Sequence, residues 1–274
     1  MMRVNTNVGS IKARAALGRV SREKVDNSLR MSSSSRVYQA SFDPAGMAIS
    51  TKMNSKIRSS QQAIRNTNDS ISMIQTAEGN ITTISTLSNR MRQLAVSAAT
   101  DTISDDERGI IDYEFQTMSN EIKRVIESAA FNGQKILDSN ELDFQIGIHN
   151  TVNEDRITYD PQKVLKSFKN LGLHRLSMKT KEGSRQAFAD LDRFLHIVSK
   201  GRAELGSLNS RVNSVVSHLE TSNVYQTKAK SMIADTDIAK ASAANARLNI
   251  LESATLESLK QVNAAPKLIA KLIG

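Results

Sequence analysis

Residues 45–100 read AGMAISTKMNSKIRSSQQAIRNTNDSISMIQTAEGNITTISTLSNRMRQLAVSAAT and contain no proline. Isoleucines recur every seven residues at Ile57, Ile64 and Ile71, and steps of three, four or seven continue the apolar stripe through Ile74, Ile81, Ile84, Met91, Ala95 and Ala98. This is the period of an amphipathic helix. At 1.5 Å per residue, a helix of about 55 residues is about 80 Å long. We therefore expect an elongated rod.

The sequence before and after this stretch also predicts helices. Residues 5–33 are amphipathic and end in four serines, whose hydroxyls compete for the backbone. Asp43-Pro44 suits a helix start, so the long helix begins there. After a break at residues 101–104, a third helix starts near Ser104 or Asp105, with acidic residues in its first turn. Its apolar face comprises Ile111, Phe115, Met118, Ile122, Val125 and Ile126.

The centre of the chain carries the strand signals. Asn132-Gly133 is a strong turn signal. From Leu142 to Ile148 apolar and polar residues alternate, which predicts a half-buried strand, and Arg156 to Tyr159 is a possible hairpin partner. Residues 160–183 are expected to be irregular, with a surface loop at 179–183.

Helical periodicity returns from Phe188 to Leu219 and again from Ile238 to Val262. Pro266 is expected to end or kink the last helix. The fold class is therefore mainly α: an elongated rod of long helices, with a terminal coiled-coil domain, a helical bundle and a small central β-hairpin region. The chain folds back, so both termini should lie at one end.

Composition limits the functions that are open to this chain. Aromatic residues make up 4% of it, and neither tryptophan nor cysteine is present. A thin bundle buries little apolar area per residue, so we expect oligomerisation to supply stability. The absence of cysteine excludes disulfides and thiolate chemistry. No apolar run approaches the roughly 20 residues of a membrane span, and the N-terminus lacks the apolar core of a signal peptide.

Charge is concentrated at the N-terminal end. Residues 1–65 contain 12 basic and 3 acidic residues, whereas the remainder balances. No aromatic platform accompanies these charges, so we expect no nucleic-acid binding. A solvated helix face, or one bound to an acidic partner, is the favoured interpretation. A membrane-surface helix at residues 1–30 is a further alternative, but no membrane insertion is expected.

The sequence offers no convergent catalytic or metal-binding set. The histidines at positions 149, 174, 196 and 218 are widely separated, and no phosphate-binding loop is present. Asp235 and Asp237 form a D-x-D pair, for which helix capping is the favoured interpretation. We therefore expect no enzymatic activity, no cofactor and no metal.

Seven stretches in register resemble bacterial flagellin, the subunit of the flagellar filament. They are RVNTN (3–7), RMSSSSRVYQASFDPAGMAIS (30–50), RNTNDSISMIQTAEGNI (65–81), LSNRMRQLAVSAAT (87–100), NEIKRVIESAAFNGQKIL (120–137), ELGSLNSRVNSVVSHL (204–219) and SMIADTDIAKASAANARLNILESATLESLKQVNAAPKLIAKLI (231–273). This chain resembles the short core form of the family without variable outer domains.

The resemblance implies a domain organisation. Residues 1–44 with 231–274 would form an inner terminal helical domain, and 45–178 with 184–230 an outer bundle with a β-hairpin. The loop at 179–183 lies where larger flagellins carry insertions. Three departures stand out: Ser34 occupies a turn position where the family usually has glycine, Asn89 and Gln93 replace a glutamine and a glutamate, and the N-terminal arm is unusually basic.

The resemblance also implies assembly. A subunit with identical contacts on unlike faces forms a helical filament. The residues expected to pack in the filament core are Val4, Val8, Ile11, Leu248, Leu251, Leu259 and Val262. The terminal helices bury little alone, so we expect them to fold on assembly. Arg90, Leu94 and Glu114 match residues that contact a toll-like receptor in some flagellins, and protofilament packing is the alternative role.

Several partners follow from the same resemblance: the chain itself as a homopolymer, an export chaperone, the flagellar secretion apparatus, and the hook-associated junction and cap proteins. The expected location is the extracellular flagellum, reached through the flagellar export channel. Two alternatives remain open: a hook–filament junction protein, and a surface adhesin or signalling coiled coil, which would show sustained heptads and a stable dimer.

Overall fold

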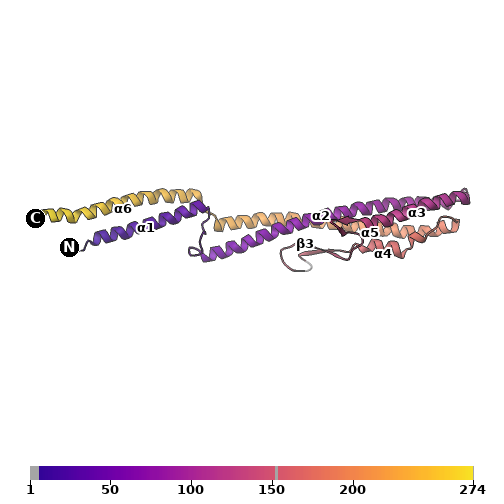
Figure 1. The fold of residues 1–274 in the computed structure, drawn as a ribbon, viewed down its shortest axis with the longest axis horizontal. Coiled ribbons are helices and arrows are strands. Elements are labelled where there is room, and N and C mark those ends of the chain that lie inside the picture. The colour runs from indigo at the N-terminus through magenta and orange to yellow at the C-terminus, as the bar shows by residue number, and fades with distance from the viewer. Residues whose placement is uncertain (1–5, 152–153, 274) are drawn as a thin grey trace. The chain divides into compact units, whose positions relative to one another are not determined.

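The computed structural model describes residues 6–151 and 154–273 and confirms a mainly helical chain. Its helices are α1 (Val8–Ser33), α2 (Pro44–Ala98), α3 (Asp105–Ser128), α4 (Gln162–Asn170), the 3₁₀ helix η1 (Leu173–Arg175), α5 (Lys181–Ala234) and α6 (Ile238–Ile273). Four short strands lie between α3 and α4: β1 (Ala130–Phe131), β2 (Gln134–Lys135), β3 (Leu142–Gln145) and β4 (Arg156–Tyr159) (Figure 1).

The chain divides into two compact units. Unit 1 comprises residues 1–57 with 224–274, and unit 2 comprises residues 58–223. The division falls inside α2 and inside α5, whereas the sequence placed the boundaries at 44/45 and 230/231. Both helices run without interruption past the points where the packing changes, so no sequence break marks these points.

Side chains at the helix starts satisfy the free backbone N–H groups there. Asn7 accepts from Ser10 N at 3.0 Å, and Asp43 Oδ1 accepts from Gly46 N at 2.7 Å. Ser104 and Glu107 form a capping box at the start of α3. These bonds explain why α2 and α3 begin where the sequence predicted.

The reversal between α2 and α3 is closed by the buried side chain of Arg108. Its Nε donates to the Ala98 carbonyl at 3.0 Å, and its Nη2 donates to the Thr100 carbonyl at 2.8 Å. Nη1 pairs with Asp105 at 2.6 Å. Because the last carbonyls of a helix lack partners within it, the guanidinium both satisfies them and complements the negative end of the helix dipole.

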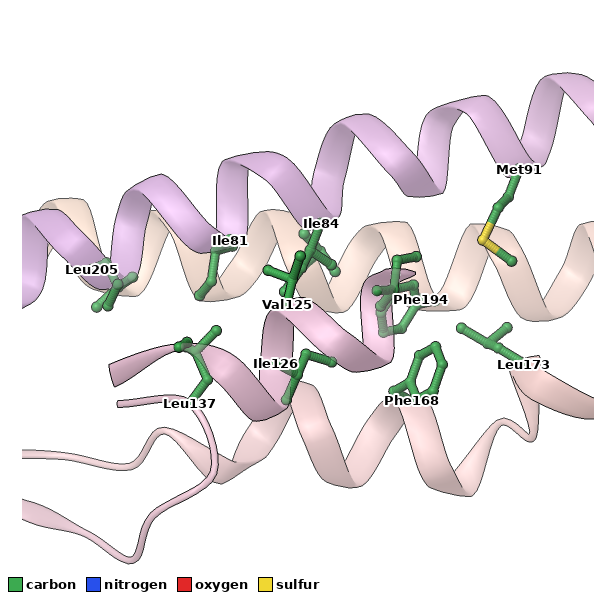
Figure 2. Packing of buried hydrophobic residues seen from close by; sticks show 14 of the residues in the cluster. Ile81, Ile84, Met91, Val125, Ile126, Leu137, Phe168, Leu173, Phe194 and Leu205 are labelled. Carbon is green, nitrogen blue, oxygen red and sulfur yellow. The ribbon is translucent and has the colours of Figure 1, made fainter. Parts of the chain in front are cut away.

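Unit 2 contains the hydrophobic core. The apolar faces of α2, α3 and α5 meet there, and α4 and η1 add Phe168 and Leu173 (Figure 2). The rings of Phe168 and Phe194 pack edge to face with centroids 5.8 Å apart. The isoleucine stripe of α2 lies in this core at Ile74, Ile81 and Ile84. The expected apolar faces of α2 and α3 are confirmed.

Two antiparallel hairpins follow α3. Asn132 and Gly133 both have positive φ, 49° and 80°, and join β1 to β2 as a tight turn that the Asn-Gly signal predicted. Strands β3 and β4 pair from Leu142 opposite Tyr159 to Gln145 opposite Arg156. The predicted hairpin is therefore confirmed, although β3 ends at Gln145 rather than at Ile148.

The expectation that residues 160–183 are irregular is wrong for residues 162–170 and 173–175, which form α4 and η1, and it holds for residues 176–180. Residues 162–170 form α4, and Phe168 of this helix is buried in the core. Asp160 Oδ1, which precedes the helix, accepts from Gln162 N at 3.1 Å. The expected loop at 179–183 is also wrong, because α5 already begins at Lys181. Thr180 Oγ1 accepts from Gly183 N at 3.1 Å, and this capping interaction starts α5 before the apolar periodicity becomes visible in the sequence.

Unit 1 is built on α1 and α6, which run antiparallel side by side (Figure 1). Asn27 Nδ2 donates to the Ala241 carbonyl at 2.8 Å, and Lys24 pairs with Glu252 at 2.6 Å. Ser34 adopts the left-handed conformation, φ 53° and ψ 14°. This serine thus takes the backbone conformation that glycine favours, and its carbonyl accepts from Thr236 N at 3.1 Å.

Helix α6 does not end at Pro266 but continues to Ile273. A proline inside a helix has no N–H for the carbonyl four residues earlier, which here is Val262. Asn7 Nδ2 donates to that carbonyl at 3.1 Å. A side chain from the N-terminal segment therefore supplies the hydrogen bond that the proline cannot make.

Candidate assembly and partner-binding surfaces

The α1 residues proposed for core packing are exposed. Val8 and Ile11 are 51% and 60% exposed, and within the described range of α1 only Ser10 is buried. Val4 lies outside the described residues. Apolar side chains of this size gain stability only when another surface covers them. The described residues of unit 1 leave Val8 and Ile11 uncovered, so a covering surface has to come from outside this unit.

The α6 residues divide between the interior and the surface. Leu248 is buried, Leu259 and Val262 are half-buried, and Leu251 is exposed. Ile250 and Leu256 are also exposed, and the sequence did not single them out because they lie outside the periodic apolar stripe of the helix. The last helix thus packs on α1 with one face and presents further apolar side chains on the other.

Arg90 of α2 and Glu114 of α3 form an ion pair. Arg90 donates from Nε and Nη2 to Glu114 Oε1, at 2.9 Å and 2.7 Å. Leu94, one turn after Arg90, is only 5% exposed and belongs to the core. The structure therefore brings the two charged residues together at the surface, whereas Leu94 is buried in the core of unit 2.

Two large apolar side chains that the sequence did not single out lie on the same helix as Glu114. Ile110 and Tyr113 are 71% and 76% exposed. Both residues lie outside the apolar face of α3. A large apolar residue outside that face is the signal that could have identified them. On α2, Asn89, Arg92, Gln93 and Val96 line a shallow hollow. The surface of α2 and α3 thus combines an ion pair with uncovered apolar groups, as protein interfaces do.

Of the acidic pair at 235 and 237, Asp237 takes the favoured capping role, whereas Asp235 forms an isolated β-bridge with Ser35. Asp237 Oδ1 accepts from Lys240 N at 3.0 Å in the first turn of α6. Among the described residues, no three histidine or acidic side chains gather as a set that could hold a metal ion. Within the same ranges, no helix has both the length and the apolar character needed to cross a membrane.

Tyr159, on β4, is the residue whose ionisation is most affected by the fold. Partial burial raises its pKa to about 12, and the nearby carboxylates of Glu204 and Asp160 add to the shift. The phenol therefore stays neutral well above the pH at which a free tyrosine ionises. This environment is structural, since the residue packs against the core of unit 2.

Comparison with known families accounts for this arrangement. The bacterial flagellin N-terminal helical region matches residues 4–141, and the bacterial flagellin C-terminal helical region matches residues 189–273. The chain belongs to the bacterial flagellins, and it is a structural subunit of the flagellar filament.

Individual relatives agree with the family match. A flagellin of Halalkalibacterium halodurans is 32% identical, with 99% of this chain and 100% of the relative aligned. A flagellin of Bacillus subtilis is 28% identical over the same shares. The crystal structure of Bacillus cereus flagellin has a TM-score of 0.50 at 24% identity and covers 57% of this chain and 88% of that one, which supports the fold. Full-length matches to flagellins favour the filament subunit over the junction protein.

Proposed function

We propose that this flagellin polymerises by covering the exposed apolar side chains of α1 and α6 with neighbouring subunits. The observation that supports this most directly is the exposure of Val8 and Ile11 on a helix in which one residue, Ser10, is buried. Two helices that bury so little against each other gain limited stability alone. Their order in the filament then depends on neighbours, so the termini fold as the subunit is added.

Seeded growth tests this proposal. Purified chain is added to sheared filament fragments in ammonium sulfate, which strengthens apolar burial and screens charge, and the products are viewed by electron microscopy. Wild type should extend the seeds, whereas Ile11→Asp should not. Thr227→Asp adds the same charge at an exposed polar position of α5 and should extend them normally. Failure of wild type to extend any seed, or normal growth by Ile11→Asp, would reject the proposal.

The surface of α2 and α3 is proposed as a second packing contact, and as a receptor contact if the filament subunit is released as a monomer. Its support is the Arg90–Glu114 pair beside Ile110 and Tyr113. Arg90→Ala should weaken toll-like receptor signalling by the purified subunit. Arg124→Ala breaks a comparable exposed pair with Glu121 on α3 and serves as the matched control. Equal dose responses for the two variants would exclude the receptor role.

The route to the filament is part of the proposal. The family resemblance supports export through the flagellar secretion apparatus with a chaperone on the C-terminal helix. Junction and cap proteins would bound the filament. A strain without the flagellar export apparatus should retain the chain inside the cell. Secretion at the normal level from that strain would contradict this route.

A further inference from the structure

The last part of α5 carries large apolar side chains that the described residues of unit 1 do not cover. Val224 and Tyr225 are both 67% exposed, and Met232 is 80% exposed. With Lys228, they form a surface, the α5 patch, that spans about 100° of the helix circumference. Thr227 lies about 60° beyond the edge of this patch. The α5 patch is therefore one continuous face with a lysine in its middle.

The charges around the α5 patch are basic. Residues 221–234 of α5 contain two lysines and no acidic residue. Lys230 Nζ donates to Asn54 Oδ1 at 3.3 Å, so α2 lies beside this part of α5. There, residues 44–57 of α2 also contain two lysines and no acidic residue. The exposed apolar groups of the α5 patch thus lie in a positively charged region.

A second uncovered apolar surface lies on α3, in unit 2. Its large members are Ile110 and Tyr113, and the exposed residues Asp106 and Thr117 lie one turn before and after them. The steps of four, three and four place these residues within about 60° of the helix circumference. This surface, the α3 patch, is distinct from the face of α3 that packs in the core.

The charges around the α3 patch are acidic. Residues 101–114 contain six acidic residues and one basic residue, Arg108. The Arg108 side chain is buried and is paired with Asp105. Glu114 is paired with Arg90, whereas Asp106 has no ion pair among the residues that the structure describes. The exposed apolar groups of the α3 patch thus lie in a negatively charged region with a free carboxylate.

We infer that the α5 patch of one copy of this chain packs on the α3 patch of the next copy. Apolar side chains cover each other in this contact, and Lys228 pairs with Asp106. Contacts between two α5 patches, or between two α3 patches, would bring like charges together, which selects against them. The contact therefore joins unlike surfaces, so each copy keeps one patch free for a further copy and the series does not close.

The inference rests on the proposed function and adds to it. The proposed packing contact on α2 and α3 receives a defined partner surface, which is the last part of α5 in a neighbouring subunit. The contact is separate from the exposed side chains of Val8 and Ile11, because it uses other helices. Two kinds of contact would then hold each subunit in the filament, and they can be tested apart.

Introduced thiols can report this contact, because the chain contains no cysteine. Thr117→Cys and Thr221→Cys place one thiol at each patch, at exposed positions that leave the apolar side chains intact. The double variant is grown on sheared filament fragments in ammonium sulfate and treated with a bismaleimide that has a short flexible spacer. Denaturing electrophoresis should show a ladder of covalent dimers, trimers and longer chains. Each single variant should remain monomeric, and an equal mixture of the two should stop at dimers.

Exchange of the charges provides the matched test. Lys228→Glu and Asp106→Lys should each raise the critical concentration for seeded growth by about threefold or more at low ionic strength, where exposed charges are not screened. With both substitutions in one chain the pair forms again with its signs exchanged, so growth should recover. Lys200→Glu makes the same change in net charge at another exposed position of α5 and should leave growth unchanged.

Three results would overturn the inference: seeds that grow without a ladder from the double cysteine variant, dimers from a single cysteine variant alone, or no recovery when both charges are exchanged. The crosslinking is repeated in concentrated solution without seeds, which separates this inference from the proposed function. A ladder there, when wild type extends no seed, rejects the proposed polymerisation through α1 and α6 alone. Growth without a ladder rejects the contact between the two patches alone, and the absence of both rejects both.

Discussion

Asn7 donates a hydrogen bond from its side-chain nitrogen to the backbone carbonyl of Val262, at 3.1 Å. That carbonyl is the one that Pro266 leaves without an intrahelical donor. The same asparagine accepts from Ser10 N at the start of α1. One side chain thus completes the first turn of α1 and an interrupted turn of α6. Gly9 lies beside this contact, where an added Cβ would be 2.8 Å from Val262 Cγ1.

Asn7→Ala should weaken filament growth. It removes a helix cap and leaves the Val262 carbonyl unpaired, which together cost about 1–2 kcal/mol. The critical concentration for seeded growth should rise roughly 5- to 30-fold. In a Pro266→Ala background, the backbone N–H of residue 266 can pair with Val262, so Asn7→Ala should cost about 1 kcal/mol less there. Identical costs in the two backgrounds would refute the shared role.

Ser34→Gly should stabilise the turn after α1. A side chain in the left-handed conformation costs roughly 1–2 kcal/mol, and glycine removes this cost. Glycine also loses more conformational entropy on folding, which offsets part of the gain in stability. A net gain of about 0.5–1 kcal/mol is expected, measured as a lower critical concentration. Ser34→Ala retains the Cβ atom and should change little, since the Ser34 backbone makes the contacts described above. Destabilisation by glycine would show that the serine side chain has a role of its own.

Leu94→Ala should destabilise unit 2, by about 2–5 kcal/mol, because it opens a cavity in the core. Arg90→Ala removes an exposed ion pair and should cost about 1 kcal/mol or less. Urea unfolding of the full chain, followed by circular dichroism, checks both values. Val96→Ala changes an exposed side chain on the same helix and is the control. A stable Leu94→Ala protein with lost signalling would instead favour a direct receptor contact by Leu94.

Tyr159 should ionise last among the four tyrosines. Its pKa is raised in the folded chain, so the stabilisation is complete below pH 10, the ordinary tyrosine pKa, and is lost as the pH rises toward about 12. The loss should be about 2 kcal/mol. Tyrosinate absorbance should show a component near pH 12 that Tyr159→Phe removes, and this variant should flatten the alkaline loss of stability. A component that persists in the variant would assign the shift to another tyrosine.

The long helices were predictable because their signals are local and repeated. Seven-residue isoleucine spacing located α2, and Asp43, Ser104 and the acids after it located two helix starts. Segments whose order depends on distant contacts were not predictable in this way. Helix α4 is nine residues long and is fixed by burial of Phe168 against Phe194. Likewise, the continuation of α6 past Pro266 depends on Asn7, which is 255 positions from Val262 in the sequence.

The candidate surfaces were predicted only in part. The family resemblance assigned Arg90, Leu94 and Glu114 to one candidate surface, and the structure shows Arg90 and Glu114 as an ion pair. The sequence could not show that Leu94 is buried, because a leucine next to the apolar stripe fits both a core residue and a surface anchor. The exposure of Ile110 and Tyr113 depends on which face of α3 packs against α2. The period of the pattern shows that two faces exist, and the three-dimensional packing decides how far each is covered.

Glu107 keeps the start of α3 capped in mildly acidic water. Hydrogen bonds from the Ser104 backbone and hydroxyl hold the pKa of Glu107 below its usual range, so this capping carboxylate stays charged at a pH that protonates part of a free glutamate. The two bonds from Arg108 to the Ala98 and Thr100 carbonyls close the adjacent reversal between α2 and α3. A bacterium that swims into acidic water therefore keeps the helix start beside this corner of its propeller subunit capped.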